Sequence, residues 1–219
     1  MSRSLSYIFP AGNTTDVCQE QSVGGAAPLV LNGNLVDSIT NQVSFISKGY
    51  VRSISITSGN NLSGVNFTIS GLQNGIAVSE VVAGPNATTV YGAEAYDVIT
   101  SVTTSAAAAD VSIGSGWKGF FPLIAINLER DVINYTLTIA RLSNASVSFS
   151  VYGTLINLTE QGTYLSKLTS SNLFQIAPPG TNPNFSYTGL TGTWAYMLVQ
   201  LGASAATIAN SMQLNFIQT

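Results

Sequence analysis

The chain has 219 residues, enough for one large β domain or two small ones with cores of their own. Charged residues make up only 8% of it, against about a quarter in ordinary soluble domains, and the net charge of −3 argues against binding to nucleic-acid phosphates. Hydrophobic residues make up 45%, yet no apolar run approaches the roughly 18 residues that a membrane-spanning helix needs, so we expect neither a nucleic-acid nor a membrane partner.

The first 25 residues are polar and rich in glycine, apart from a short apolar group at Tyr7, Ile8 and Phe9. An extended arm that packs on a neighbouring molecule and a disordered tail both fit this composition. We expect an N-terminal arm over residues 1–25, with the apolar group as its anchor at an interface. The segment lacks the long apolar stretch of a secretion signal, so we expect synthesis in a cytoplasm.

Alternation of apolar and polar residues predicts strands in the part that follows. In residues 50–57 and again in residues 65–70, apolar side chains alternate with Ser, Thr, Asn and Arg. Valine, isoleucine and threonine dominate these runs and favour a pleated surface. Turn signals separate the runs, at residues 59–61, 71–75 and 84–86. We therefore expect a β-sandwich-like unit over residues 26–116.

The second half of the chain repeats this pattern. Residues 139–153 resemble residues 56–71 when one gap is allowed, and each half continues with an Ala-Tyr pair, a strand and an alanine-rich turn. The pairs are Ala95-Tyr96 and Ala195-Tyr196. We therefore expect an all-β protein of two tandem β-sandwich-like units that share one order of elements.

Glycine predicts the boundary between the units. Residues 114–119 (GSGWKG) form the most flexible short stretch in the middle of the chain. We therefore expect the second β-sandwich-like unit over residues 117–219. At this junction we expect three aromatic residues to lie at an interface, namely Trp117, Phe120 and Phe121.

Histidine is absent from the sequence, and cysteine occurs only once. It contains no histidine, which excludes the serine–histidine and cysteine–histidine mechanisms and imidazole metal sites. Its single cysteine, Cys18, cannot form an internal disulfide or a cysteine-rich zinc site. We therefore expect no catalytic residues, no metal and no cofactor.

The scarcity of charge also predicts how the surface is used. A soluble monomer usually keeps itself dispersed with charge, and edge strands are usually guarded by lysine. Only three lysines occur, Lys48, Lys118 and Lys167. We therefore expect weakly polar surface and open sheet edges to be covered by other chains, in an oligomer of this chain or in a larger lattice. A monomer hydrated by its Ser and Thr side chains is the alternative.

Several segments resemble a pattern found in a known class of proteins. They are residues 64–71 (GVNFTISG), 78–86 (VSEVVAGPN), 98–105 (VITSVTTS) and 110–114 (DVSIG), with a continuation at 121–123 and 132–137. This order of strand, hairpin and strand resembles small virion structural proteins of tailed bacteriophages, over about residues 50–155. The motifs are structural, so the resemblance implies a virion component and transfers no catalytic residue.

Composition and resemblance together predict a non-enzymatic viral structural protein. We expect a capsid decoration or cement protein that stabilises the particle through protein–protein interfaces and is located in the virion. Its partners would be copies of itself and a major capsid or tail protein, each contact burying on the order of 1,600 Å². A tail or head-fibre adaptor is the alternative within the same class.

Binding of a host glycan by an adhesion module is the alternative from another class. Sugar sites in β-sandwiches use exposed Trp and Tyr rings, with amide side chains around them. The candidates are Trp117, Trp194, Tyr187 and Tyr196, with Asn182, Asn184 and Gln200 near them in sequence. Because residues 194–201 form an almost wholly apolar run, we favour core positions for Trp194 and Tyr196.

Overall fold

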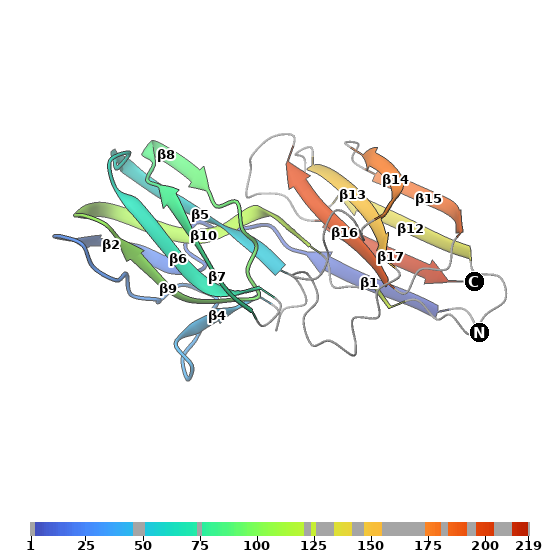
Figure 1. Cartoon of the computed structure of the whole chain (residues 1–219), viewed down its shortest axis with the longest axis horizontal. Coiled ribbons are helices and arrows are strands. Elements are labelled where there is room, and N and C mark those ends of the chain that lie inside the picture. The colour runs from blue at the N-terminus through green and yellow to red at the C-terminus, as the bar shows by residue number, and fades with distance from the viewer. Residues whose placement is uncertain are drawn as a thin grey trace. The chain divides into compact units, whose positions relative to one another are not determined.

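The computed structural model of the chain is shown in Figure 1. It describes residues 3–45, 51–73, 76–120, 124–125, 134–141, 147–154, 174–180, 184–191, 196–203 and 212–218. Every described element is a β-strand, which confirms the all-β fold predicted from the sequence. The described part contains no helix of the length and apolarity needed to cross a membrane.

The chain divides into two compact units. We call residues 12–118 the central unit, and residues 1–11 together with 119–219 the terminal unit. This division differs from the expected one, because the first 25 residues do not form a part of their own. Each unit is described separately below.

The central unit contains two antiparallel sheets. Its strands are β2 (Cys18–Val23), β3 (Val36–Asp37), β4 (Gln42–Ser44), β5 (Val51–Asn61), β6 (Asn66–Gln73), β7 (Ile76–Ala83), β8 (Asn86–Tyr91), β9 (Val98–Thr104) and β10 (Ala108–Phe120). One sheet has the order β2-β10-β5-β8 and the other the order β3-β4-β9-β6-β7. Figure 1 shows them as two layers, which gives the unit a β-sandwich-like character.

The core of the central unit lies between these layers. Ile54 and Ile56 of β5, and Phe67 and Ile69 of β6, have no exposed surface. They recur with the period of two that predicted both strands. Full burial of such a side chain stabilises a fold by about 1.5–3 kcal/mol, so this cluster holds the two sheets together.

The terminal unit is built from the remaining strands. They are β1 (Arg3–Phe9), β11 (Ile124–Ala125), β12 (Asn134–Arg141), β13 (Val147–Thr154), β14 (Phe174–Gly180), β15 (Asn184–Thr191), β16 (Tyr196–Ala203) and β17 (Met212–Gln218). One sheet has the order β1-β17-β12-β15. A second has the order β14-β13-β16, in which β16 also pairs with β11 and with Gly119 and Phe120 at the end of β10.

The two units share one pattern of strand pairing. In the central unit β5 pairs with β8 and β10, β6 pairs with β7 and β9, and β10 also pairs with β2. In the terminal unit β12 pairs with β15 and β17, β13 pairs with β14 and β16, and β17 also pairs with β1. Each strand from β5 to β10 thus has a counterpart among β12 to β17, in the same order.

Buried residue pairs also correspond between the units. Ile69 and Val102 lie opposite each other on β6 and β9, and Val151 and Val199 lie opposite each other on β13 and β16. All four side chains have no exposed surface. The sequence repeat aligns Ile69 with Val151, so similar residues occupy corresponding core positions in the two units.

The expected N-terminal arm is not confirmed as a separate segment. β1 pairs residue by residue with β17 from Arg3 to Phe9, and the Phe9 side chain is buried. β2 pairs with β10 in the central unit. These residues are too polar to form a core alone, but their backbone groups satisfy the unpaired groups of existing sheet edges. They therefore complete one sheet in each unit.

The glycine-rich stretch at residues 114–119 is part of β10, not a flexible linker, although the division between the units falls inside it. A Cβ at Gly114 would collide with the backbone of Asn13, and a Cβ at Gly116 would collide with the Ser53 hydroxyl. Glycine occupies these positions because neighbouring groups approach the strand closely.

Candidate interaction surface

The residues predicted to form interfaces fall in different settings. Phe9 is only 2% exposed and has almost no surface to offer a neighbour, whereas Ile8 is 57% exposed. Adjacent residues of a strand point to opposite sides, which accounts for the contrast. The structure places three others in strands without describing their side chains, namely Tyr7, Trp117 and Phe120. Phe121 lies outside the described residues.

The residues named for glycan binding are described only in part. Four of them lie in β15 and β16 without described side chains, namely Asn184, Tyr187, Tyr196 and Gln200. Asn182 and Trp194 lie outside the described residues. Glycan binding therefore stays a prediction.

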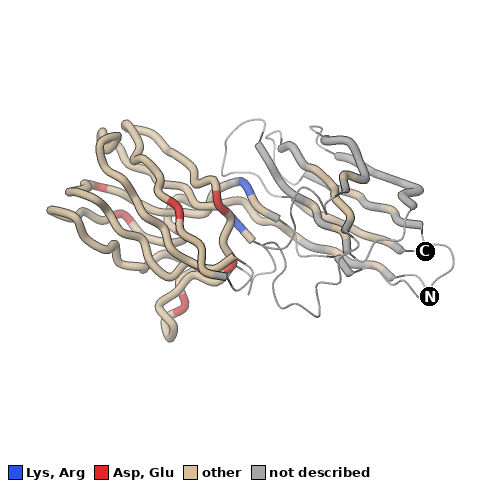
Figure 2. Tube along the Cα trace, viewed as in Figure 1, with Lys and Arg blue, Asp and Glu red and all other residues tan. Residues whose placement is uncertain are grey.

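Charge is sparse and dispersed in the central unit. Figure 2 shows its described acidic residues as separate positions along the chain. Its described basic residues are Arg52 and Lys118. Among the described residues, no three His, Cys, Asp or Glu side chains lie close enough to hold a metal ion. Within this described part, the acidic residues offer no grouped site for a cation.

One face of the five-stranded sheet carries no charged side chain on β6, β7 and β9. The register places the members of this face side by side, and the hydroxyls of Ser70 and Ser79 lie 3.3 Å apart across β6 and β7. We call this surface the neutral face. Its members are Ala77, Ser79, Val81 and Ala83 of β7, Asn66, Thr68, Ser70 and Leu72 of β6, and Val98, Ser101 and Thr103 of β9, all exposed or half-buried.

β7 forms the outer edge of this sheet, because its only described strand partner is β6. The register between the two strands is unbroken over eight residue pairs. Just beyond it, the Gly84 N–H donates to the Val65 carbonyl over 2.8 Å. Since the direction of backbone hydrogen bonds alternates along an antiparallel strand, β7 bonds to β6 through Val78, Glu80 and Val82.

The other residues of β7 turn their backbone groups outward. The N–H and C=O groups of Ala77, Ser79, Val81 and Ala83 meet no partner among the described residues. The side chains of these four residues are exposed on the neutral face, and Val81 is 63% exposed. This edge therefore offers both unpaired backbone groups and uncharged side chains to another chain.

The single charge on β7 is turned away from that face. Glu80 Oε2 accepts hydrogen bonds from the N–H groups of Ala93, at 2.8 Å, and Glu94, at 3.3 Å. Glu80 Oε1 accepts one from the Tyr96 hydroxyl at 3.0 Å. Burial of Tyr96, together with the negative charge of Glu80, raises the pKa of that hydroxyl. Glu80 thus fixes the segment between β8 and β9.

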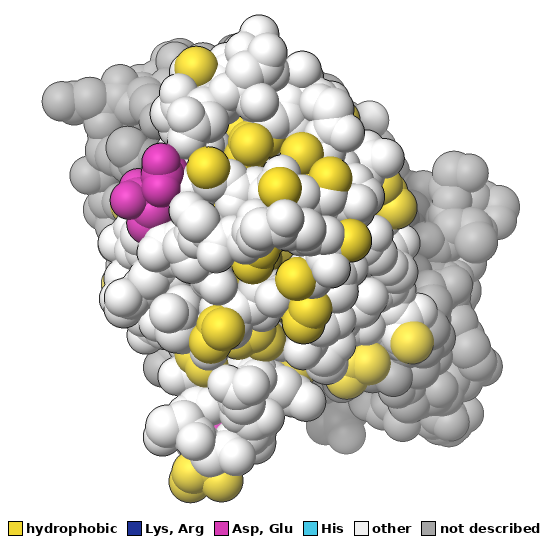
Figure 3. Space-filling view, turned by 90° about the vertical axis from the view of Figure 1, so that its left-hand side faces the viewer, with side chains coloured by type: hydrophobic (Ala, Val, Ile, Leu, Met, Phe, Trp, Pro, Cys, Tyr) yellow, Lys and Arg dark blue, Asp and Glu magenta, His cyan; other side chains and the backbone are white. Residues whose placement is uncertain are grey.

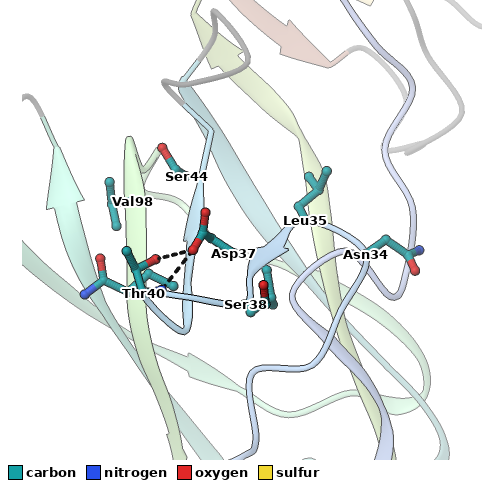
Figure 4. Close-up of a pocket in the computed structure, with 9 residues that line it drawn as sticks. Asn34, Leu35, Asp37, Ser38, Thr40, Ser44 and Val98 are labelled. Atoms are coloured by element: carbon teal, nitrogen blue, oxygen red, sulfur yellow. Dashed lines mark hydrogen bonds between the residues drawn. The ribbon is translucent and has the colours of Figure 1, made fainter.

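A tight hairpin ends the opposite edge of the same sheet. Asp37 Oδ1 accepts hydrogen bonds from the N–H groups of Ile39, at 2.9 Å, and Thr40, at 2.8 Å. Figure 4 shows the carboxylate directed into its own turn, toward Thr40. These bonds hold the pKa of the Asp37 carboxyl below its usual range. Ile39 is 93% exposed, so the turn presents an apolar side chain to solvent.

A pocket of about 590 Å³ lies beside this hairpin. It is lined by Asn34, Leu35, Val36, Asp37, Ser38, Thr40, Gln42, Ser44 and Val98. Among the described lining residues Asp37 is the only titratable one, and its carboxylate already closes the turn. The described lining therefore offers no acid paired with a base.

A second depression, of about 480 Å³, lies where β2 and β5 end and β10 begins. Its lining is uncharged and consists of Ser22, Val23, Gly24, Asn60, Asn61, Leu62, Ala107, Ala108 and Ala109. Figure 3 looks onto the left-hand side of Figure 1 and shows apolar side chains scattered over an otherwise uncharged surface, with acidic side chains at its margin and near the lower loop.

No protein-family model and no curated protein matches this sequence.

Proposed function

We propose that the chain is a non-enzymatic structural protein that works by forming protein–protein interfaces. The observation that supports this is the neutral face together with the open edge of β7. Uncharged surface beside unpaired backbone groups favours association with another chain over dispersion in water. Central parts of protein interfaces are likewise depleted in charge.

The particle in which it would act is a virion. The support for this step is the resemblance of residues 64–71 and the segments after them to virion structural proteins of tailed bacteriophages. The chain would be made in the host cytoplasm and added to the capsid as a decoration protein, bound to a major capsid protein and to other copies of itself. Decoration proteins stabilise a shell by burying surface, which requires no catalytic group.

The architecture that we propose for this role is a tandem pair of β-sandwiches derived from one repeated unit. The shared pairing pattern supports it, as do the corresponding buried pairs Ile69–Val102 and Val151–Val199. A duplicated unit offers two related sets of faces and edges, so one chain can contact more than one neighbour.

The decisive experiment is quantitative mass spectrometry of gradient-purified particles from the source, scaled to the major shell protein. A copy number comparable to that of the shell protein is expected for a decoration protein. A few copies per particle would identify a tail or head-fibre adaptor in place of a decoration protein. Absence from the particles would overturn the virion assignment.

A further inference from the structure

The described strands of the central unit leave four sheet edges, at β2, β3, β7 and β8. β2 carries the exposed Glu20 and pairs with β10 through two register shifts. β8 has a register shift against β5 and contains Ala87, whose φ is 50°. β3 has only two residues. Charge, bulges and shortness are devices that keep sheet edges from pairing.

β7 has none of these devices. It is eight residues long, its register against β6 is unbroken, and it contains no lysine and no proline. Its one charged residue, Glu80, is turned inward. An inward charge can guard an edge because a new strand would bury it, but three hydrogen bonds already compensate this carboxylate.

The terminal unit provides an internal comparison. The counterpart of β7 there is β14, which contains Pro178 and Pro179 and pairs with β13 through two register shifts. Proline has no N–H to donate and is confined to edge strands and bulges. The corresponding edge strand is therefore blocked in the terminal unit, at β14, and open in the central unit, at β7.

A second copy of this chain is the occupant that fits the open edge. A twofold contact brings the same strand to both sides, so the strand must not repel itself. The outward residues of β7 are uncharged and small or β-branched, which satisfies this condition. A strongly charged partner would find no opposite charge on the neutral face.

The positions of the outward groups restrict the register of such a contact. A twofold axis at residue 80 would place two Glu80 side chains directly opposite each other, which like charges disfavour. An axis at residue 81 places Val81 opposite Val81 of the second copy and Ser79 opposite Ala83 of the second copy. All outward groups from residue 79 to residue 83 then exchange backbone hydrogen bonds, and the most exposed valine of the edge is covered.

We propose that β7 pairs antiparallel with β7 of a second copy, across a twofold axis at Val81, and joins the two five-stranded sheets into one. The contact rests on the proposed assembly function, of which it is one interface.

Substitution at the axis tests the contact in the full-length chain by sedimentation equilibrium. Val81→Lys places two like charges opposite each other, so it should raise the dimer dissociation constant by about tenfold or more. Val30→Lys is the matched control, because Val30 is 62% exposed and lies outside both β7 and the neutral face. A monomeric unsubstituted chain, or equal weakening by both variants, would overturn the proposal.

Cross-linking tests the register. The native thiol, Cys18, is buried and its pKa is raised to about 12 by burial, so it reacts little with oxidants. Under oxidation Val81→Cys should form a disulfide-linked dimer, whereas Thr88→Cys on the edge strand β8 should not. Equal cross-linking of both variants, or none at Val81→Cys, contradicts the proposed edge.

The two proposals can fail independently. Particles that contain the chain at high copy number but give no Val81→Cys dimer would overturn the β7 contact and retain the structural function. A Val81→Cys dimer from a chain that is absent from particles would retain the contact and overturn the virion assignment. Matching circular dichroism of the variants and the unsubstituted chain excludes misfolding as the cause.

Discussion

The central and terminal units keep the same strand pairing but differ in charge. Residues 12–118 contain seven Asp and Glu and three Lys and Arg, whereas the terminal unit contains three acidic and four basic residues. Corresponding core positions stay apolar and buried, as Ile69 and Val151 illustrate. Packing constrains the core of both units, while the surface of each is free to take a separate role.

The units also differ around their corresponding edge strands. β6 and β7 are joined by two residues, 74–75, whereas β13 and β14 are joined by residues 155–173. The short link reads Asn-Gly, a sequence typical of two-residue hairpins, which match the twist of regular antiparallel strands. The regular register of β7, and hence its open edge, is consistent with this short link.

Truncation of core side chains at corresponding positions should give the largest change in the free energy of unfolding. Ile69→Ala should lower the free energy of unfolding by about 2–5 kcal/mol, because it removes buried methyl groups and leaves a cavity. Val151→Ala should lower it in the same way by roughly 2 kcal/mol, since fewer atoms are lost. Urea denaturation followed by circular dichroism measures both. No change in either variant would contradict the correspondence between the two cores.

Glycine substitution separates close packing from flexibility in β10. Gly114→Ala should lower the free energy of unfolding by about 1–3 kcal/mol, because the new Cβ meets the backbone of Asn13. Gly59→Ala is the control, since no atom lies within 4 Å of a Cβ at that position. It should be neutral or slightly stabilising. Equal effects of the two variants in thermal unfolding would restore the linker interpretation of residues 114–119.

Removal of the Tyr96 hydroxyl tests its hydrogen bond to Glu80. The strand register shows no equivalent of this bond among the described residues of the terminal unit. Tyr96→Phe leaves the carboxylate with one donor fewer and should cost about 1–2 kcal/mol at neutral pH. Urea denaturation at pH 7 gives the value. An unchanged free energy of unfolding would show that the Ala93 and Glu94 N–H groups alone hold Glu80.

Alkaline pH should weaken the fold through the same hydroxyl. The folded pKa of Tyr96 lies above the unfolded value of about 10, so its contribution is complete below about pH 10 and falls as pH rises toward the folded pKa. Tyr96→Phe should therefore lose less stability than the unsubstituted chain between pH 8 and 11. Cys18, whose pKa is raised to about 12, contributes a similar loss in both proteins. Parallel losses would contradict the role of Tyr96.

The smallest effect is expected at the tip of the β3–β4 hairpin. Ile39 is 93% exposed, so Ile39→Ser should change the free energy of unfolding by less than about 0.5 kcal/mol. Thermal unfolding of the variant measures this. A larger loss would mean that Ile39 packs against the protein itself.

Local pattern predicted the strands well, because alternation is a property of neighbouring residues. It did not predict that β5 is buried on both sides from Val51 to Ile56, with Ser53 and Ser55 fully covered. The pattern indicated solvent on the serine side. Which residues cover a strand depends on segments that are distant in sequence, so the alternation within the strand cannot predict its burial.

Similarity between the two halves of the sequence did not align every residue correctly. Similarity paired Tyr96 with Tyr196, but Leu72 lies opposite Val98 and Thr154 lies opposite Tyr196. Since Leu72 and Thr154 correspond, the counterpart of Tyr196 is Val98. Tyr96 lies outside β9, where its hydroxyl donates a hydrogen bond to Glu80. Thr100 is an extra residue between the paired Ile99 and Ser101, and it shifts the register by one. Sequence similarity does not reveal such a shift.

The sequence predicted that open sheet edges exist, but not which strand forms one. Few lysines indicated open edges, whereas which strand lies at an edge follows from the whole sheet. Both faces of β7 carry apolar residues, so its sequence did not show which face points outward. The inward Glu80 became recognisable only with Tyr96 and the Ala93 N–H in position around it.

The burial of Cys18 supplies a built-in reporter of motion. It is the single thiol of the chain, and it lies at the start of β2, opposite Ile113 of β10. A thiol reagent can modify it only when this part of the central unit opens. The rate of labelling under native conditions, divided by the rate in the unfolded chain, thus gives the free energy of that opening without any substitution.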